Sequence, residues 1–129
     1  MSEPVVNQAT LFDISDEAIN SLVFNENGLI PAIAQDFRSG KVLMMAWMDA
    51  EAIRRTAKTG RMWYWSRSRQ EYWCKGETSG DRQWVRRISQ DCDRDVLLFE
   101  IDQEGKGACH TGEESCFYRQ LGSRLESSL

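Results

Sequence analysis

The longest uninterrupted apolar run in this chain is only seven residues, Val42 to Met48. A helix that crosses a bilayer needs about 20 consecutive apolar residues, so the sequence predicts no membrane span. A short apolar run bounded by polar turn residues is instead typical of a strand. The chain has 129 residues, of which 41% are apolar, and this predicts one compact domain spanning 1–129.

Turn-forming and helix-capping residues divide the chain into short elements. Asp49 is a good N-cap, and Gly60 is placed to end the helix that follows it. Ser15 can cap another helix in the same way. The predicted class is therefore α+β, a strand-rich domain with a few short helices. We expect helices over 15–24 and 50–58, strands over 29–37, 42–48, 62–66, 84–89 and 93–101, and loose ends over about 1–10 and 122–129.

The first twelve residues have neither a basic start nor a continuous apolar stretch, so they do not resemble a secretory signal. We therefore expect a cytoplasmic, reducing location. Under those conditions the four cysteines stay free thiols, which proteins hold for metal binding or catalysis more often than for disulfides.

Charge is unevenly distributed along the chain. The total is 16 basic against 20 acidic residues, a net charge of -4, which argues against a protein that coats nucleic acid. Between residues 54 and 90, however, ten Lys or Arg stand against three acidic residues, and eight of the ten are Arg. Such a segment suits a small polyanion such as a phosphorylated metabolite, because Arg makes planar, bidentate phosphate contacts. The alternative is a solvated surface whose charges pair with the acidic flanks.

Aromatic and cationic residues are interleaved within residues 62–73, MWYWSRSRQEYW. The rings and Arg67 could form a stacking platform for bases, although large aromatics on a strand more often belong to a core or an interface. The segment KGETSG, 75–80, could bind a phosphate through its glycines, hydroxyls and lysine, but its spacing is not that of a Walker loop. The candidate substrate-binding residues are Arg67, Lys75, Thr78 and Ser79.

Three aspartates alternate at Asp91, Asp93 and Asp95. If this segment is extended, the period of two places all three carboxylates on one side of the strand. Hard carboxylate oxygens in that arrangement suit Mg²⁺. An EF-hand is excluded, because its sixth position needs Gly where Val96 stands and its twelfth needs Glu where Asp102 stands. The alternative is a solvated strand edge without a metal.

Three of the four thiols, Cys92, Cys109 and Cys116, are near the only histidine, His110, in the sequence. Structural zinc sites normally have four protein ligands, commonly in C-x-x-C pairs, which this chain lacks. Three thiolates with an open fourth position fit a catalytic zinc better. His110 could move protons beside such a metal, or it could be a hydrogen-bonded turn histidine. Cys74 is the spare thiol, for which we expect a small buried side chain.

In combination these segments resemble one family, phosphoribosyl-AMP cyclohydrolase of histidine biosynthesis. The resemblance covers most of the chain from 29 to 121. It implies hydrolytic opening of the N1–C6 bond of the adenine ring in 1-(5-phosphoribosyl)-AMP. It also implies a homodimer with one zinc per subunit, shared between the subunits, and Mg²⁺ as a second metal. The matching stretches are MAWMDAEA, YWSRSR (64–69), WCKGETSG (73–80), QDCDRD (90–95) and CHTGEESCF (109–117).

Carried over by position, the resemblance assigns zinc to the thiols at 92, 109 and 116, and magnesium to the three aspartates. Three thiolates leave Zn²⁺ with a net negative formal charge, which makes its bound water less acidic. We therefore expect His110 to take the proton of the attacking water, and Mg²⁺ together with the cationic purine to restore positive potential. Many relatives are fused to a pyrophosphohydrolase, and we expect only the cyclohydrolase half in this chain.

Three other functions stay open from the residues alone. A zinc-dependent purine deaminase would also direct water to C6 of a purine, but its H-x-E and P-C-x-x-C motifs are missing. A zinc-stabilised module for single-stranded nucleic acid would use the aromatic and arginine segment, and the net charge of -4 argues against it. A purely structural zinc domain is the third. We expect a phosphorylated nucleotide and a second copy of the chain as partners, and neither nucleic acid nor membrane.

Overall fold

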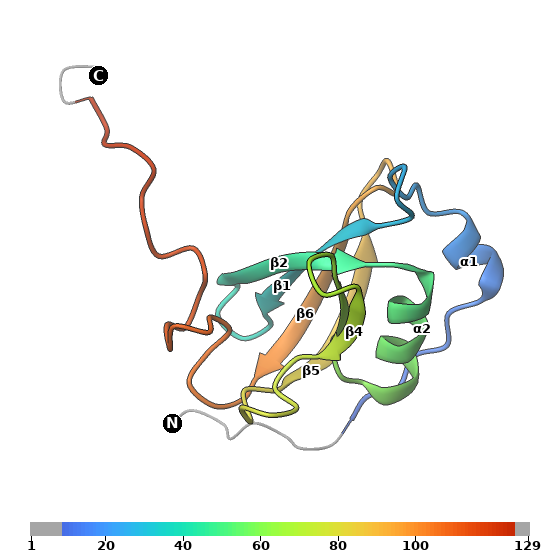
Figure 1. Ribbon diagram of the computed structural model, residues 1–129, viewed down its shortest axis with the longest axis horizontal. Coiled ribbons are helices and arrows are strands. Elements are labelled where there is room, and N and C mark those ends of the chain that lie inside the picture. The colour runs from blue at the N-terminus through green and yellow to red at the C-terminus, as the bar shows by residue number, and fades with distance from the viewer. Residues whose placement is uncertain (1–8, 126–129) are drawn as a thin grey trace.

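A computed structural model describes residues 9–125 of the chain. These residues form two helices and six strands (Figure 1). Neither helix of this region is long and apolar enough to cross a bilayer. The strand-rich α+β class expected from the sequence is confirmed. The elements are α1 (Asp16–Asn20), β1 (Ile30–Asp36), β2 (Val42–Met48), α2 (Ala50–Thr59), β3 (Trp63–Ser66), β4 (Glu71–Cys74), β5 (Gln83–Gln90) and β6 (Leu97–Gln103).

All six strands form one sheet in the order β4-β3-β2-β1-β6-β5. The pair β1 and β6 is parallel, and the other neighbouring pairs are antiparallel. The Met62 N–H donates to the Gln83 carbonyl at 3.1 Å, and the Val85 N–H donates to the Gly60 carbonyl at 2.8 Å. These two bonds join the chain just before β3 to β5, so the sheet curls and nearly closes on itself.

The hydrophobic core lies inside this curled sheet and beneath α2. Tyr64 is the largest fully buried side chain, and its hydroxyl donates to Oε1 of the equally buried Gln83 at 2.8 Å. A buried hydroxyl needs a hydrogen-bond partner, so this pair fixes β3 against β5. Other fully buried apolar side chains are Ile30, Met48, Ile53, Met62, Val85, Phe99 and Ile101.

The second helix begins and ends where the capping residues predict. The Asp49 carboxylate accepts a hydrogen bond from the Ala52 N–H at 2.8 Å, and Gly60 ends the helix with a φ of 72°. On the buried face, the Thr56 hydroxyl donates to the Ala52 carbonyl at 2.9 Å and accepts from the Trp63 N–H at 3.0 Å. The same hydroxyl therefore ties α2 to the start of β3.

The boundaries of two predicted elements are wrong. The first helix ends at Asn20 and not at Phe24, because the Val23 N–H donates to the Arg94 carbonyl at 2.7 Å instead of continuing the helical pattern. The strand expected over 93–101 begins only at Leu97, since the preceding residues form a turn. In addition, β4 was not predicted. It forms because the turn 67–70 brings it back onto β3.

The expected loose ends fall largely outside the described residues. Thr10, which is described, is held in place, since its hydroxyl accepts a hydrogen bond from Nη1 of Arg86 at 3.3 Å. At the other end, residues 122–125 are exposed and belong to no helix or strand. The segment after β6 first folds back toward the sheet and then leads away from it (Figure 1).

We predict that Gly60→Ala destabilises the fold more than Gly40→Ala. Both glycines have similar φ values, 72° and 78°, so both replacements introduce the same backbone strain, about 1 kcal/mol. A Cβ on Gly60 would lie 2.8 Å from the Ala9 Cβ and from the Thr10 carbonyl oxygen, whereas nothing lies within 4 Å of one on Gly40. Urea unfolding should show roughly 1–3 kcal/mol more loss at Gly60. Equal losses for the two variants would contradict the prediction.

Candidate metal centre and active site

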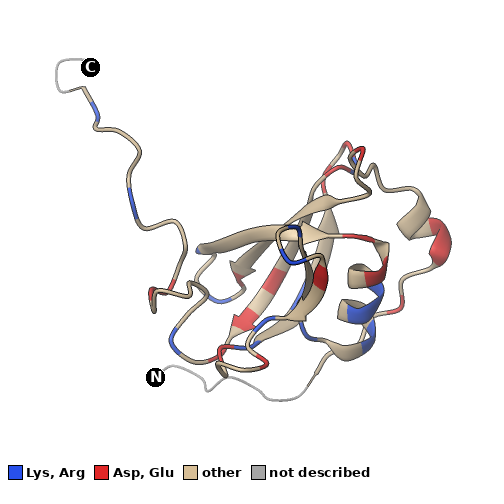
Figure 2. Cartoon of the chain, viewed as in Figure 1, with Lys and Arg blue, Asp and Glu red and all other residues tan. Residues whose placement is uncertain are grey.

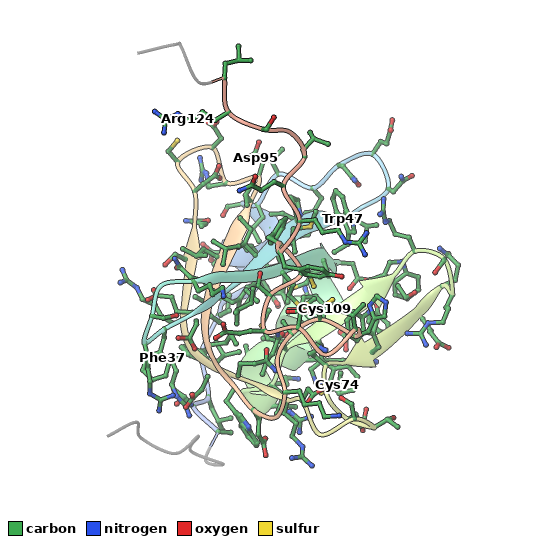
Figure 3. All side chains as sticks on the ribbon, turned by 90° about the vertical axis from the view of Figure 1, so that its left-hand side faces the viewer. Phe37, Trp47, Cys74, Asp95, Cys109 and Arg124 are labelled. Atoms are coloured by element: carbon green, nitrogen blue, oxygen red, sulfur yellow. The ribbon has the colours of Figure 1, made fainter. Side chains whose placement is uncertain are left out.

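The candidate metal-binding residues lie at the two ends of β6. The aspartates are in the turn between β5 and β6, and Cys109 and Cys116 are in the segment that follows β6. Figure 3 shows Asp95 and Cys109 well apart along the vertical direction of the view. The seven residues of β6 span about 20 Å of extended chain, so the strand holds the two donor sets apart.

Asp91, Asp93 and Asp95 converge, although the segment is a turn and not the extended strand that we predicted. One ligand oxygen from each lies within 4.8 Å of the others, and the described residues contain no other such group of three His, Cys, Asp or Glu. The turn is made by Asp91, whose Oδ1 accepts from the N–H of Asp95 at 3.0 Å and of Val96 at 3.3 Å. An Asp side chain that binds backbone N–H groups ahead of it favours a turn over a strand. We call residues 91–95 the acidic turn.

The carboxylates of the acidic turn influence one another's ionisation. Partial desolvation acts to raise the pKa of Asp91, but the N–H donors of the turn outweigh it and hold this pKa below its usual range. A hydrogen bond with Asp91 raises the pKa of the Asp95 carboxyl. Three carboxylates this close together repel one another, and a hard divalent cation bound between them would relieve that repulsion. The acidic turn therefore has the donor chemistry that suits Mg²⁺.

A second loop, which folds back on itself, brings two thiols together. The Ala108 N–H donates to the Glu114 carbonyl at 2.9 Å, and the Cys109 N–H donates to the Glu113 carbonyl at 3.2 Å. Gly107 permits this close return, because a Cβ there would lie 2.5 Å from the Glu113 carbonyl oxygen. These contacts hold residues 107–109 against residues 113 and 114, which closes the loop.

Two hydrogen bonds attach this loop to β2. The Cys116 N–H donates to the Leu43 carbonyl at 2.7 Å, and the Ser115 hydroxyl donates to the Val42 carbonyl at 2.8 Å. In this arrangement the thiols of Cys109 and Cys116 are near enough to influence each other's pKa. We call these two residues the thiol pair.

The two members of the thiol pair ionise unequally. The Thr111 hydroxyl, 2.9 Å from Sγ of Cys109, lowers the pKa of that thiol. Burial raises the pKa of the Cys116 thiol, as do its hydrogen bond and charge interaction with Cys109, while the Lys75 ammonium acts in the opposite direction. Two adjacent thiols, one of them already inclined to ionise, fit a soft cation such as Zn²⁺.

Cys92 does not join the thiol pair within one protomer. It is exposed in the acidic turn, at the other end of β6. One copy of the chain therefore brings together two of the three predicted zinc ligands. His110 is exposed directly beside Cys109 in the chain. Cys74 is buried, as expected for the spare thiol, and this burial raises its pKa.

Most of the basic segment between 54 and 90 is neutralised by nearby acids. Figure 2 shows this mixing along α2, where blue and red segments are adjacent. For most of the segment the alternative of a solvated, charge-paired surface is therefore correct. Six of the ten cations lie within 4.0 Å of a carboxylate, in the pairs Arg54–Asp16, Arg55–Glu51, Arg69–Glu71, Arg82–Glu104, Arg86–Asp102 and Arg87–Glu100.

Four cations of this segment have no carboxylate partner among residues 9–125. Lys58 is exposed on α2. Arg61 and Arg67 lie over aromatic rings, Arg67 at 4.9 Å from the centroid of Trp47. Lys75 is buried, with 9% of its surface exposed. The cations left over for a ligand are therefore few, and those that are not on α2 lie beside aromatic rings or in the protein interior.

Three pockets extend from Asp95 of the acidic turn across β2 and β3 to the loop 75–79. The first, of about 280 Å³, is lined by Asp95 and Trp47. The second, of about 600 Å³, shares Trp47 and is also lined by Arg67 and Trp73. The third, of about 320 Å³, shares Trp73 and is lined by the loop 75–79. Because neighbouring pockets share a wall, we treat them as one aromatic groove.

The aromatic groove contains all four residues that the sequence nominated for substrate binding. Arg67 lies at its middle, while Thr78 and Ser79 are exposed at its end. Lys75 lines the same end but is buried, which the sequence did not predict. Trp47 and Trp73 were missed as individual groove residues, and their only sequence signal was the general clustering of aromatics and Arg.

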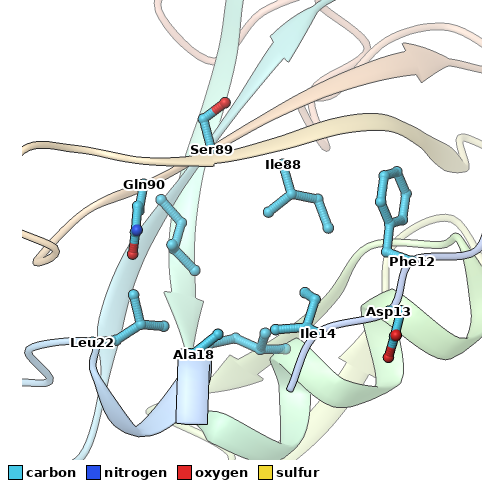
Figure 4. A pocket seen from close by; sticks show the side chains of 10 residues that line it. Phe12, Asp13, Ile14, Ala18, Leu22, Ile88, Ser89 and Gln90 are labelled. Atoms are coloured by element: carbon cyan, nitrogen blue, oxygen red, sulfur yellow. The ribbon is translucent and has the colours of Figure 1, made fainter. Parts of the chain in front are cut away.

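A separate pocket of about 290 Å³ lies between α1 and β5 (Figure 4). Its lining is mainly apolar and includes Phe12, Ile14, Leu22 and Ile88. Asp13 is the one titratable residue in that lining. This pocket therefore has neither the arginine nor the tryptophans that line the aromatic groove.

Comparison with known proteins identifies the family. The family model described as Phosphoribosyl-AMP cyclohydrolase matches residues 44–118, more than half of the chain. The chain belongs to the phosphoribosyl-AMP cyclohydrolase family. The matched cyclohydrolase region contains the acidic turn, the thiol pair and the tryptophans of the aromatic groove.

Individual cyclohydrolase relatives agree. A Phosphoribosyl-AMP cyclohydrolase of Cereibacter sphaeroides is 62% identical over 101 residues, 78% of this chain and 84% of that protein. One of Bordetella parapertussis is 60% identical over 100 residues, 78% of this chain and 75% of that protein. The Histidine biosynthesis bifunctional protein HisIE of Thermosynechococcus vestitus is 55% identical over 109 residues, and the match spans 84% of this chain but 50% of that protein.

We predict that Asp93→Asn and Asp91→Ala separate metal binding from turn stability. Asp93→Asn removes one carboxylate charge and should weaken Mn²⁺ binding, measured by electron paramagnetic resonance, about tenfold or more. Its melting temperature should stay that of the parent chain. Asp91→Ala also removes the acceptor for two N–H groups, so it should lower stability as well, by about 1 kcal/mol. Unchanged Mn²⁺ affinity in Asp93→Asn would rule out a cation site at the acidic turn.

Proposed function

We propose that this chain hydrolyses the N1–C6 bond of the adenine ring in 1-(5-phosphoribosyl)-AMP. The product would be the formimino-aminoimidazole-carboxamide ribonucleotide, in a step of L-histidine biosynthesis. The observation that carries the proposal is the family match over residues 44–118, which contains both metal-type donor sets and the tryptophans and Arg67 of the aromatic groove.

We assign one zinc per subunit to the thiol pair of one copy and Cys92 of a second copy. Three facts support this assignment: the thiol pair is formed within one protomer, β6 keeps Cys92 away from it, and Cys92 is exposed. Zn²⁺ bound there would supply a water molecule acidic enough to attack C6 near neutral pH.

His110 is proposed as the base that accepts the proton of the attacking water. It follows Cys109 directly and is exposed, so its ring can reach solvent beside the thiol pair. An imidazole exchanges protons readily near neutral pH, which is the condition that a general base must meet.

The aromatic groove is proposed to hold the substrate. Trp47 and Trp73 offer ring faces against which a purine can stack. Arg67, in the middle of the groove, and the hydroxyls of Thr78 and Ser79, at its end, are available to phosphate oxygens. We place Mg²⁺ at the acidic turn, where it would neutralise a substrate phosphate.

The proposed assembly is a homodimer. Large apolar side chains gather after the thiol pair and are exposed, among them Phe117 at 65% and Leu121 at 105%. The segment that carries them leads away from its own sheet in Figure 1. Exposed apolar residues next to an incomplete set of metal ligands favour a second copy of the chain as the partner.

A cytoplasmic location and a small-molecule partner complete the proposal. All four cysteines are free thiols, as a reducing compartment would keep them. Acids pair with six cations of the basic segment, so little unpaired positive charge is left for a nucleic acid.

We predict that two inactive thiol variants restore activity when they are combined. Cys92→Ser and Cys109→Ser should each lose ring opening of phosphoribosyl-AMP, followed by ultraviolet absorbance. In a co-refolded equal mixture, half the dimers are hybrids with one intact and one doubly substituted site. About a quarter of the parent activity should therefore return, and a zinc chelator should remove it.

The matched control combines Cys109→Ser with Cys116→Ser. Both substitutions affect the thiol pair, so no hybrid contains an intact site and the mixture should stay inactive. An inactive first mixture, with both variants folded and dimeric, would count against a shared zinc. Ammonia release from the nucleotide without ring opening would instead indicate a purine deaminase.

We predict that His110→Ala lowers kcat/KM about 100-fold or more, because the attacking water loses its base. The acidic limb of the pH profile of kcat/KM should also disappear, since this limb reports protonation of the free base. Metal content, measured on the same sample, should stay that of the parent. An unchanged rate with an unchanged acidic limb would remove His110 from this role.

A further inference from the structure

A cavity of about 450 Å³ adjoins the aromatic groove. It shares Trp65 and Arg67 with the 600 Å³ part of the groove, and it shares Leu29 with the part that contains Asp95. Its volume lies within the usual range of ligand-binding cavities, about 300–1,000 Å³. We call this cavity the polar pocket. Four of its six lining residues carry polar side-chain groups, and these are Asn27, Asp49, Arg67 and Gln70.

The Asp49 carboxylate is fixed in the wall of the polar pocket. Its Oδ1 accepts from the Ala52 N–H at 2.8 Å, and its Oδ2 accepts from the Tyr72 hydroxyl at 2.6 Å. Burial and the bond to Asp49 raise the pKa of Tyr72 to about 12, so the phenol keeps its proton and remains a donor. Two donors from different elements, α2 and β4, therefore set the orientation of this carboxylate.

Asp49 keeps hydrogen-bonding capacity for a ligand. A carboxylate has about four acceptor sites, and the bonds from Ala52 and Tyr72 occupy two of them. The residue is half-buried, and no Lys or Arg among residues 9–125 lies within 4.0 Å of its carboxylate. Asp49 can therefore accept further hydrogen bonds from a molecule in the polar pocket.

Two carboxamides line the same pocket. The Nε2 of Gln70 donates to the Arg67 carbonyl at 2.8 Å, while its Oε1 accepts no bond from the described residues. Gln70 holds this place with a φ of 55°, a left-handed conformation that is costly for a residue with a side chain. Asn27 is exposed, and its side chain makes no hydrogen bond within 9–125. The pocket thus offers neutral donors and acceptors beside one fixed carboxylate.

The charges of the polar pocket favour a sugar over a phosphate. Asp49 would repel a phosphate, and the one cation in the lining, Arg67, also lines the aromatic groove and lies over Trp47. Sugar hydroxyls, in contrast, donate to carboxylates. An acidic side chain that binds a ribose hydroxyl is a recurring feature of dinucleotide-binding folds. Leu29 and Trp65 supply the apolar part of the wall, against which the C–H groups of a sugar can pack.

We propose that the polar pocket is a ribose-binding subsite, in which Asp49 accepts a hydrogen bond from a hydroxyl of one ribose of the substrate. This inference rests on the proposed function, because 1-(5-phosphoribosyl)-AMP carries a ribose on each side of its purine. The pocket adjoins the part of the groove proposed for the purine and the part where Mg²⁺ would neutralise a phosphate. A ribose links a purine to a phosphate, so a sugar site next to both parts suits this order.

The test measures whether Asp49 recognises a sugar hydroxyl. The probes are ribose 5-phosphate, 2-deoxyribose 5-phosphate and 3-deoxyribose 5-phosphate, each titrated with Mg²⁺ into the full-length, zinc-loaded protein. Dissociation constants come from nuclear magnetic resonance shifts of the side-chain amides of Asn27 and Gln70. The parent should bind ribose 5-phosphate about tenfold or more tightly than at least one deoxy sugar, because a hydrogen bond to a carboxylate is lost.

Asp49→Asn should reduce this preference to about threefold or less, mainly by weakening the binding of ribose 5-phosphate. Asn caps a helix as well as Asp does, and its amide can donate to the Tyr72 oxygen, so the melting temperature should stay near that of the parent. A residue with only a structural role would instead weaken the binding of all three sugars equally. If Asp49→Asn does not fold, Asp49→Ser takes its place, since Ser is also a good N-cap.

Asp36→Asn is the matched control. Asp36 is also half-buried and accepts a backbone N–H, that of Ser39 at 2.8 Å, but it lines neither the polar pocket nor the aromatic groove. This variant should keep the preference of the parent for ribose 5-phosphate.

Equal affinity of the parent for the three sugars overturns this inference, as does the absence of amide shifts at millimolar ribose 5-phosphate. A preference that survives in Asp49→Asn also overturns it. Adenine that shifts the two amides more strongly than ribose 5-phosphate does so too, in favour of a base subsite. Ring opening of phosphoribosyl-AMP by the parent is measured separately. Ring opening without ribose preference removes this inference alone, whereas ribose preference without ring opening overturns the proposed function and leaves a site for ribose phosphates.

Discussion

The length and burial of β6 determine which of the candidate metal ligands one copy of the chain can bring together. Leu97, Phe99 and Ile101 point into the core, and the strand pairs on both sides with β1 and β5. Such a strand cannot bend to bring its ends together, and the three thiols form no common cluster in the described part of one protomer. The separation rules out a centre built from all three thiols of one protomer.

The hydrogen bonds that attach residues 115 and 116 to β2 determine the electrostatic environment of the thiol pair. The bonds from Cys116 and Ser115 to β2 place one thiol in a partly desolvated position, where thiolate formation is unfavourable. Thr111 makes ionisation easier at Cys109 by its hydroxyl, and Lys75 acts on Cys116 by its charge.

Elements with strong local signals were predicted well. The caps Asp49 and Gly60 define α2 to within one residue, because capping depends on neighbours in sequence. β4 was missed because Glu71–Cys74 is too short to show a pattern, and only pairing with β3 makes it a strand. The aspartates at 91, 93 and 95 do converge, but by a different route from the predicted one. Alternation along a strand and a side-chain-capped turn can both gather three carboxylates, and the backbone bonds to Asp91 decide between them.

By itself the sequence determined which reactive side chains the protein carries: three clustered carboxylates, thiols near a single histidine, and aromatics mixed with Arg. It also determined the family motifs that contain them. These depend on residue type and short spacing, which sequence states directly. Only the tertiary structure decided which groups meet. It brought Cys109 near Cys116 and left Cys92 at the far end of β6, it paired six of the ten cations of the segment 54–90 with acids, and it buried Lys75. Such outcomes depend on strand pairing and packing between residues distant along the chain, and no local pattern encodes those distances.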